Sequence, residues 1–181
     1  MKYTLYADLH IGNKYMNHRI LPTSRDVVEK DNCYALGDIF DLKNAEANEL
    51  AGLLIEYNEY RELFKDRLVS GNHEGNDLPI NIHLDNKILL THYDWALWDA
   101  AKVNKFRNEK RGQGCGIPQW IASKTHGKVG KTDKKNAAAY AKKYNSTCII
   151  GGHTHTKKLI DEVVDGVRVI FLPVGKTILD L

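Results

Sequence analysis

The stretch STCIIGGHTH, residues 146–155, ends an apolar run with two histidines one residue apart. Its continuous apolar residues are typical of a strand that is buried on both faces. Such a strand gains little from two imidazoles, because each ring has two nitrogens that need a hydrogen-bond partner or a bound ion. His153 and His155 therefore need a binding partner, and the residues elsewhere in the chain indicate which one.

Other apolar runs predict a mixture of strands and helices. Short continuous or alternating runs are typical of strands, and apolar residues three or four apart are typical of an amphipathic helix. Asp85-Asn86 and Asp165-Gly166 are turn pairs that predict two hairpins. The order of these elements predicts an α/β (α+β layered) domain with a helical insert at residues 94–144. We expect strands at 3–7, 32–38, 67–72, 147–152 and 177–181, strand pairs within 80–92 and 158–173, and helices within 45–64, 95–106 and 135–144.

The length of the chain fits one domain over residues 1–181. Its first residues do not resemble a signal peptide and no apolar stretch has membrane-spanning length, so we expect a cytoplasmic protein without a membrane span. Cys33, Cys115 and Cys148 are odd in number and outside any Cys-x-x-Cys pattern, so the sequence indicates neither a disulfide framework nor a zinc knuckle. The sequence leaves the oligomeric state open.

Charge is unevenly distributed along the chain. Residues 102–143 contain 12 Lys and Arg against two acids, Glu109 and Asp133, whereas the remainder holds 14 basic and 21 acidic residues. One interpretation is a solvated helical surface. The other is an electropositive wall that collects an anionic substrate. Trp95 and Trp98, which precede this basic segment, and Trp120 within it fit the packed face of a helix better than a base-stacking platform.

Polar residues stand where the predicted strands end. In a layered α/β sheet, the loops beyond the strand ends are where ligands bind. Five strand ends would therefore bring their polar side chains to one place. These residues are Asp8, His10, Asp38, Asp41, Asn72, His73, Glu74, His92, His153 and His155.

The chemistry of this set points to metal ions. Carboxylates, an amide oxygen and imidazoles without a thiolate suit hard or borderline divalent metals, with Mn²⁺ as the first expectation and Fe²⁺, Ni²⁺ or Zn²⁺ as alternatives. The set has too many donors for one ion. Two ions about 3.5–4 Å apart need a carboxylate between them and further donors on each side, which this set can supply.

The same residues resemble the signature blocks of a known family. The blocks are DLH (residues 8–10), GDIFD (37–41), GNHE (71–74), THYD (91–94) and GHTH (152–155). In order and spacing they resemble those of the calcineurin-like metallophosphoesterases, whose fold is a β-sandwich flanked by helices. The basic helical insert before the last block resembles the layout of the UDP-2,3-diacylglucosamine pyrophosphohydrolase-like branch.

The resemblance implies a role for each residue. Asp8, His10 and His155 would hold one metal, and Asn72, His92 and His153 the other. Asp38 would bridge the two metals, His73 would be the catalytic imidazole, and Asp41 would hold His73 in its working tautomer. A hydroxide that bridges the metals would attack the phosphorus of a phosphate mono- or diester. Glu74 is left with a structural or supporting role.

Departures from the family pattern narrow the range of possible substrates. Leu42 follows Asp41 where protein Ser/Thr phosphatases of this superfamily have Arg-Gly, and the insert lacks the apolar character that acyl chains need. We expect a small phosphorylated or nucleotide-type substrate, with Arg107, Lys110 and Arg111 binding its other phosphates. The alternatives are a nuclease or polynucleotide end-processing phosphatase, whose insert would hold the nucleic-acid backbone, and a non-catalytic scaffold of the same fold.

Overall fold

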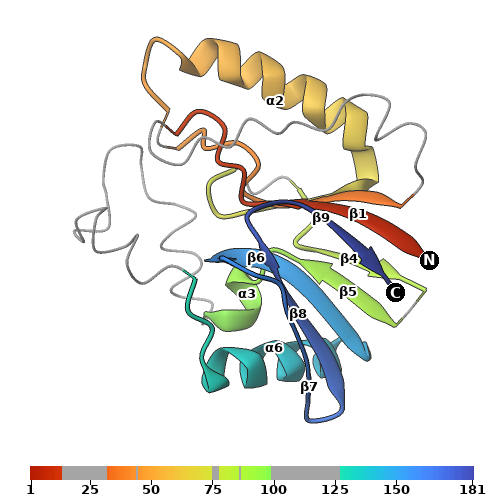
Figure 1. Ribbon diagram of the computed structural model, residues 1–181. Helices are drawn as coiled ribbons and strands as arrows, with labels where there is room; N and C mark the ends of the chain where they lie inside the picture. Colours follow the sequence, from red (N-terminus) through yellow and green to blue (C-terminus); the bar gives the residue numbers. More distant parts are fainter. Residues whose placement is uncertain (14–31, 44, 75–77, 86, 99–126) are drawn as a thin grey trace.

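Two β-sheets pack face to face and helices cover their outer faces, which gives four layers (Figure 1). The computed structural model describes residues 1–13, 32–43, 45–74, 78–85, 87–98 and 127–181. This arrangement confirms the predicted α/β sandwich flanked by helices. No helix within the described ranges is long and apolar enough to cross a bilayer.

The first sheet has four strands in the order β3-β2-β1-β9. Strands β1, β2 and β3 are parallel, and β9 lies antiparallel to β1. Strand β3 is shorter than predicted, because the chain leaves the sheet after Val69 and the residues from Ser70 onward form a loop. The strand bounds are β1 Lys2–Ala7, β2 Cys33–Leu36, β3 Leu68–Val69 and β9 Gly175–Asp180.

The second sheet has five strands in the order β4-β5-β6-β8-β7. Strands β5, β6 and β8 are parallel, and β4 and β7 run antiparallel at the two edges. The predicted hairpin between β7 and β8 is present, and φ is positive at both Asp165 (50°) and Gly166 (82°), as a type I′ turn requires. The bounds are β4 Asn81–Leu84, β5 Ile88–Thr91, β6 Cys148–Thr156, β7 Ile160–Val164 and β8 Val167–Pro173.

Apolar side chains from both sheets fill the space between them. Leu5 and Leu36 of the first sheet meet Ile150 and Leu172 of the second, and all four are fully buried. Each such side chain stabilises the fold by about 1.5–3 kcal/mol relative to an exposed position. This central layer fixes the two sheets against each other and therefore fixes the strand ends of one sheet relative to those of the other.

Helix α2 (Leu50–Phe64) covers the outer face of the first sheet and continues into the 3-10 turn η1 (Lys65–Arg67). Its buried side chains recur at helical spacing, and they pack with Phe40 from the loop after β2. The helix begins at Leu50 and not at Ala45 as predicted: Ala45 is buried in the same core cluster, but residues 47–49 form only a turn. The buried residues of α2 are Leu53, Tyr57, Tyr60 and Phe64.

Helix α6 (Lys131–Lys143), together with the short helix α3 (Asp94–Leu97), covers the outer face of the second sheet. Ala137, Ala138 and Ala141 pack with residues of β6 and β8, and their small size lets the helix approach the sheet closely. Helix α6 is the helix predicted at 135–144, with an earlier start, and it forms an outer layer of the sandwich. Residues 99–126 lie outside the described residues, so the insert at 94–144 stays a prediction.

Candidate metal centre

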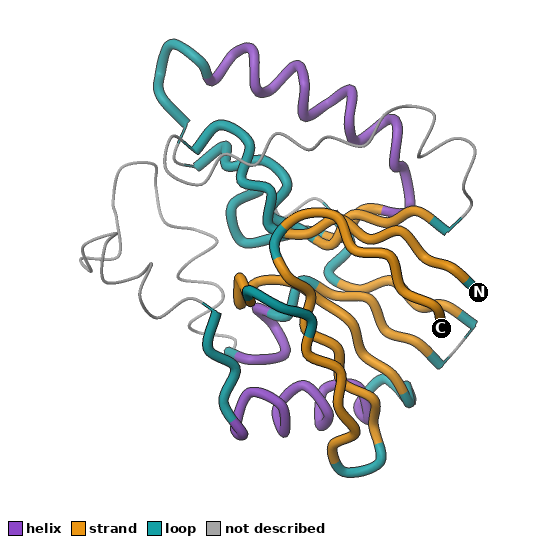
Figure 2. Tube along the Cα trace, in the orientation of Figure 1, coloured by secondary structure: helices purple, strands orange, loops and turns teal. Residues whose placement is uncertain are grey.

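The loops that follow β1 and β2 leave the sandwich at the end away from the chain termini, and the carboxyl end of β6 lies there too (Figure 2). The parallel strands of both sheets point their carboxyl ends to this edge. The structure thus brings the predicted residues together at one edge: Asp8 and His10 after β1, Asp38 and Asp41 after β2, Asn72 and His73 after β3, His92 after β5, and His153 and His155 in β6. The predicted substrate-binding residues Arg107, Lys110 and Arg111 lie outside the described residues.

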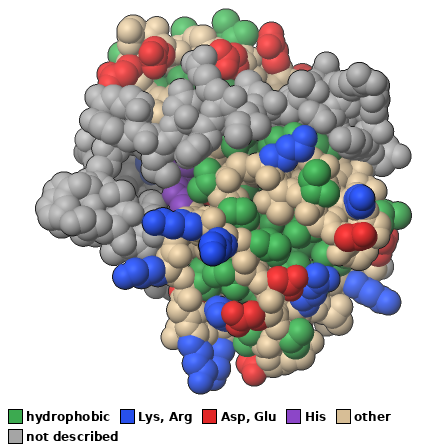
Figure 3. Space-filling view, viewed as in Figure 1, with side chains coloured by type: hydrophobic (Ala, Val, Ile, Leu, Met, Phe, Trp, Pro, Cys, Tyr) green, Lys and Arg blue, Asp and Glu red, His purple; other side chains and the backbone are tan. Residues whose placement is uncertain are grey.

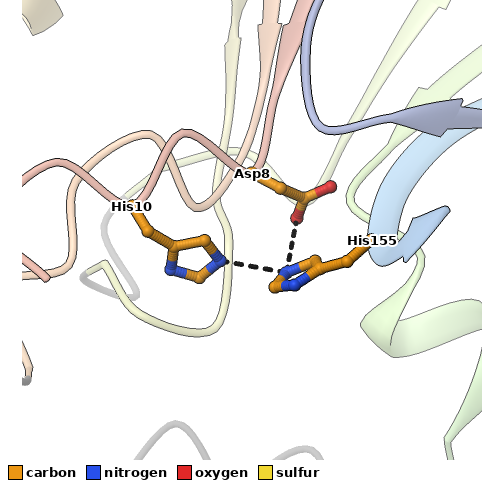
Figure 4. Close-up of side chains that lie close together, drawn as sticks. All are labelled: Asp8, His10 and His155. Carbon is orange, nitrogen blue, oxygen red and sulfur yellow. Dashed lines mark hydrogen bonds and ion pairs between the residues drawn. The ribbon is translucent and has the colours of Figure 1, made fainter. Parts of the chain in front are cut away.

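Asp8, His10 and His155 form a first ligand group, in which the three potential ligand atoms lie within 4.8 Å of one another. The side chains point toward a common centre from β1 and β6 (Figure 4). The Nε2 atoms of His10 and His155 are 3.0 Å apart, and His155 Nε2 lies 3.5 Å from Asp8 Oδ1. Two ring nitrogens that face each other at this distance can share a proton or turn their lone pairs to a cation.

Asp38, His92 and His153 form a second ligand group of the same kind. His92 Nε2 lies 3.1 Å from Asp38 Oδ2 and 3.2 Å from His153 Nδ1. The amide oxygen of Asn72 lies 3.2 Å from His92 Nε2 and so adds a further oxygen donor to this group. This donor set of imidazole nitrogens with carboxylate and amide oxygens fits a hard or borderline divalent cation.

Asp38 lies between the two ligand groups. Its Oδ2 atom is 3.1 Å from His92 Nε2 in the second group and 3.9 Å from His10 Nε2 in the first. Its Oδ1 atom accepts a hydrogen bond from the backbone N–H of His73 at 2.8 Å. One carboxylate is therefore held within reach of both groups, as a pair of neighbouring cations requires.

Burial and neighbouring charges set the protonation of this cluster. Burial opposes ionisation of Asp8 and Asp38, but nearby histidines outweigh it and lower the pKa of both carboxyls. Burial also lowers the pKa of His10 and, more strongly, that of His153. Ionised carboxylates and neutral imidazoles are the protonation states that metal ligands need, so the residues present fit divalent cations.

His92 differs from the other histidines of the cluster. Its Nδ1 donates a hydrogen bond to the carbonyl of Leu36 at 2.9 Å, which directs Nε2 toward the second ligand group. Burial disfavours the charged ring, but Asp38 and then Asp8 outweigh it and raise the pKa of His92 to about 10. Metal binding at His92 Nε2 therefore competes with a proton and is favoured at higher pH.

His73 stands at the mouth of the cluster, with its side chain 24% exposed. Its Nδ1 lies 2.8 Å from Asp41 Oδ1, and its Nε2 lies 4.0 Å from Asp38 Oδ2. Burial opposes the charged imidazolium, but Asp38 and Asp41 outweigh it and raise the pKa of His73. Burial also opposes ionisation of Asp41, but His10 and His73 hold its pKa far below the ordinary value. The carboxylate of Asp41 thus favours the imidazolium form of His73.

The backbone at the ligands is not that of regular strands or loops. Its φ is positive at Asp8 (56°), His10 (47°), Asp38 (52°), His153 (69°) and His155 (48°). Residues with side chains rarely adopt this region, and such strain concentrates at functional sites. The alternation of a regular strand would place His153 and His155 on one side of the sheet. Both residues have a left-handed backbone, however, and the pairing of β6 with β8 shifts register between Gly151 and Thr156. The two histidines therefore reach different ligand groups through this irregular backbone.

Two glycines allow the backbone to approach the carboxylates closely. A Cβ atom at Gly71 would overlap the backbone nitrogen and Oδ1 of Asp38, and one at Gly152 would overlap Oδ2 of Asp8. The backbone N–H that follows Gly152, that of His153, donates to both oxygens of Asp8 at 2.9 and 2.8 Å. Gly71 of the GNHE block and Gly152 of the GHTH block are therefore required, because any side chain there would collide with a carboxylate.

Glu74 has a supporting role that the sequence alone did not define. Its Oε1 accepts hydrogen bonds from the backbone N–H groups of Ile39 (2.9 Å) and Phe40 (3.2 Å), and its Oε2 accepts one from Gly71 (3.1 Å). Burial and the charge of Asp38 raise the pKa of Glu74 to about 7. The side chain ties the loop after β2 to the loop after β3, and its place at the end of the GNHE block was the only signal for this role.

Two aromatic residues also contact the site region. Trp98 directly follows α3 with an extended backbone, so it does not lie on a helix face as predicted. Its ring lies edge-on to His153, with ring centroids 4.4 Å apart and an angle of 81°. Tyr93 has the left-handed backbone (φ 78°) that glycine adopts more easily. Its hydroxyl lies 3.1 Å from the carbonyl of Ile149 and 2.9 Å from that of Ile170, so the ring is anchored between β6 and β8.

Comparisons with known proteins agree with this geometry at the family level. A family model described as calcineurin-like phosphoesterase matches residues 1–157. No curated protein matches the chain significantly.

Solved structures show only distant likeness. Vacuolar Protein Sorting 29 from Cryptosporidium parvum has 18% sequence identity and a TM-score of 0.46, covering 96% of this chain and 74% of that chain. A protein from Streptococcus pneumoniae described as a predicted phosphoesterase has 15% identity, a TM-score of 0.46 and coverages of 96% and 74%. Phosphopantetheinyl hydrolase from Mycobacterium tuberculosis has 16% identity, a TM-score of 0.38 and coverages of 96% and 89%. At these levels the solved structures carry no functional argument.

Proposed function

The chain belongs to the calcineurin-like phosphoesterase family, and on this premise we propose that it hydrolyses a phosphate mono- or diester with two divalent metal ions. The observation that carries the proposal is the position of Asp38 between two ligand groups, with the His73–Asp41 pair beside it. Bound there, two divalent cations supply activation of water and neutralisation of phosphoryl charge. Asp8, His10 and His155 would hold one cation and Asn72, His92 and His153 the other, with Asp38 within reach of both ligand groups.

His73 is proposed to act as the general acid. Asp41 accepts the Nδ1 proton of His73 at 2.8 Å, which leaves the second proton of the imidazolium on Nε2. The raised pKa of His73 favours retention of that proton. Nε2 then donates the proton to the leaving oxygen of the ester as the bond to phosphorus breaks.

We propose Mn²⁺ as the working metal, with Fe²⁺, Ni²⁺ or Zn²⁺ as alternatives. The ligand groups combine imidazole nitrogens with carboxylate and amide oxygens, and no thiolate belongs to them. Of the cysteines in the described part of the chain, Cys33 and Cys148 are buried in core clusters. The soft metals that select thiolates are therefore disfavoured.

The substrate is proposed to be a small phosphorylated or nucleotide-type molecule. Lys and Arg side chains lie beside the visible part of the histidines (Figure 3). Gly127 donates its N–H to the carbonyl of Thr154 at 2.6 Å, which places the exposed Lys128 next to the GHTH segment, and the exposed Lys157 and Lys158 follow that segment directly. Together with Arg107, Lys110 and Arg111, these cations would bind further phosphates of the substrate.

The first test is hydrolysis by protein that has been stripped of metal and then supplied with Mn²⁺. We expect the stripped protein to be inactive and Mn²⁺ to restore cleavage of bis-p-nitrophenyl phosphate or p-nitrophenyl phosphate, because both ligand groups must be filled. A nucleoside-diphosphate sugar and single-stranded DNA complete the substrate panel. Binding of two Mn²⁺ ions without hydrolysis of any of these substrates would contradict the enzymatic proposal and favour the scaffold alternative.

A nuclease is the second candidate function, because Lys128, Lys157 and Lys158 form a basic rim beside the ligand groups. If this rim holds a nucleic-acid backbone, the double variant K157E/K158E should make the negative slope of log kcat/KM against log salt shallower by roughly 1.4 on single-stranded DNA. Cleavage of bis-p-nitrophenyl phosphate should not change.

The matched control for this test is K142E/K143E. Lys142 and Lys143 are exposed at the carboxyl end of α6, at the opposite end of the sandwich from the ligand groups. The nuclease candidate predicts that this variant keeps the salt dependence of the unaltered protein. Equal effects of the two double variants would show that only net charge matters and would exclude the rim as a binding surface for the nucleic-acid backbone.

A further inference from the structure

We propose that Asn13 is a positioning residue that divides the Asp41 carboxylate between two imidazoles, the proposed acid His73 and the proposed ligand His10. This inference rests on the proposed function for its catalytic consequence, but its geometry does not depend on activity. Asn13 lies outside the five signature blocks of the sequence.

Backbone pairing sets the position of Asn13. The segment after β1 runs beside the segment after β2, with hydrogen bonds from His10 N–H to the Asp38 carbonyl and from Asp41 N–H to the Ile11 carbonyl, both at 2.9 Å. Asn13 N–H in turn donates to the His10 carbonyl at 3.0 Å. The side chain of Asn13 is buried, and its amide nitrogen donates to Asp41 Oδ2 at 2.6 Å.

The two oxygens of Asp41 then have different partners. Oδ1 lies 2.8 Å from His73 Nδ1, whereas Oδ2, the oxygen that Asn13 holds, lies 3.5 Å from His10 Nδ1. Within the described part of the chain, His10 Nδ1 is buried and has no hydrogen-bond partner at this distance. His10 therefore attracts the same carboxylate that orients His73.

The Asn13 amide decides this competition by fixing the plane of the carboxylate. Without the hydrogen bond to Oδ2, Asp41 can rotate toward His10 Nδ1 and loosen its bond to His73 Nδ1. A carboxylate behind a metal-binding histidine fixes the tautomer and orientation of the ring, so Asp41 also prepares His10 to present Nε2 to the first ligand group. Asn13 thus keeps one oxygen of Asp41 bonded to His73 while the other oxygen faces His10.

The variant Asn13→Leu tests this inference, because leucine has the same branching at Cγ but cannot donate a hydrogen bond. We expect kcat for bis-p-nitrophenyl phosphate to fall by about 10- to 100-fold, the usual effect of removing a partner behind the primary ligands, with KM nearly unchanged. In the ¹H NMR spectrum of the Zn²⁺-loaded protein, the downfield Nδ1–H signal of His73, assigned by its loss in His73→Gln, should move upfield or exchange faster.

The matched control is Asn81→Leu, since the Asn81 amide also donates a partly buried hydrogen bond, to the Tyr140 hydroxyl of α6 at 3.1 Å. It should leave kcat and the His73 signal unchanged. An Asn13→Leu protein with an unchanged kcat and an unchanged His73 signal overturns the inference, as does a change in KM alone. If Asn13→Leu does not fold, the smaller Asn13→Ala, which also cannot donate a hydrogen bond, is judged by the same outcomes. If the unaltered chain cleaves no ester, the proposed function fails, and the NMR signal still decides the role of Asn13.

Discussion

Replacing Asp38 by alanine is expected to lower phosphoesterase activity by at least about 1,000-fold, because loss of the metal charge removes several kcal/mol of transition-state stabilisation and each 1.36 kcal/mol is tenfold in rate. Asp38 is the carboxylate within reach of both ligand groups, and its removal leaves His10 and His92 without their shared anion. The number of Mn²⁺ ions bound per chain should also fall, which metal analysis after gel filtration measures.

The control for Asp38 is Asp161→Ala, which removes a carboxylate of β7 that pairs with Arg168 of β8 at 2.8 Å. That variant should keep both its metal content and its activity. Asp38 also accepts a hydrogen bond from the backbone N–H of His73, so its removal could affect folding. Circular dichroism shows whether the Asp38→Ala protein is folded. A folded Asp38→Ala protein that binds two metals and cleaves the diester at the normal rate is incompatible with the proposed centre.

Replacing His73 by glutamine is expected to lower kcat by about 10²- to 10⁴-fold, the contribution of a well-placed general acid, while the metal content stays at two ions. The loss should be larger for an alkyl phosphate than for a p-nitrophenyl ester, because a poor leaving group needs the proton more. His83→Gln is the matched control, since His83 is exposed on β4. Loss of metal from His73→Gln would instead make His73 a ligand.

The pH dependence of the same variant separates an acid from a structural residue. Asp38 and Asp41 raise the pKa of His73 above its ordinary value of 6.5, so the ring keeps its second proton to a higher pH than a free histidine does. An activity that needs this proton is therefore present below the raised pKa and declines as pH rises through it. His73→Gln should lack that alkaline decline in kcat, and a decline of the same shape in the variant would remove His73 from the acid role.

The architecture and the convergence of the site residues could be predicted from the sequence. Both depend on the pattern of apolar residues and on the order of the elements along the chain. Buried strands such as 147–152 show continuous apolar residues, and polar residues placed directly after them must meet where parallel strands end. The structure confirms the sandwich and brings those residues to one edge. The chemical roles assigned to them stay proposals.

The features that the sequence did not predict depend on contacts between residues far apart in the chain. The left-handed backbone at His153 follows from no local pattern and accompanies its hydrogen bonds to Asp8, 145 positions earlier. Glu74 and Asn13 acquire their roles only once the segment after β2 lies beside the segments after β3 and β1. Periodicity predicts which face a residue occupies, but it carries no information on such pairwise contacts.

The tight fit at Gly71 and Gly152 has a consequence for how this protein tolerates random change. Any larger residue at either position must displace Asp38 or Asp8 from its place. A saturation mutagenesis screen would therefore find intolerance at two positions that possess no chemical group of their own. Such a tolerance map would outline the reactive centre partly through residues whose whole contribution is to leave room.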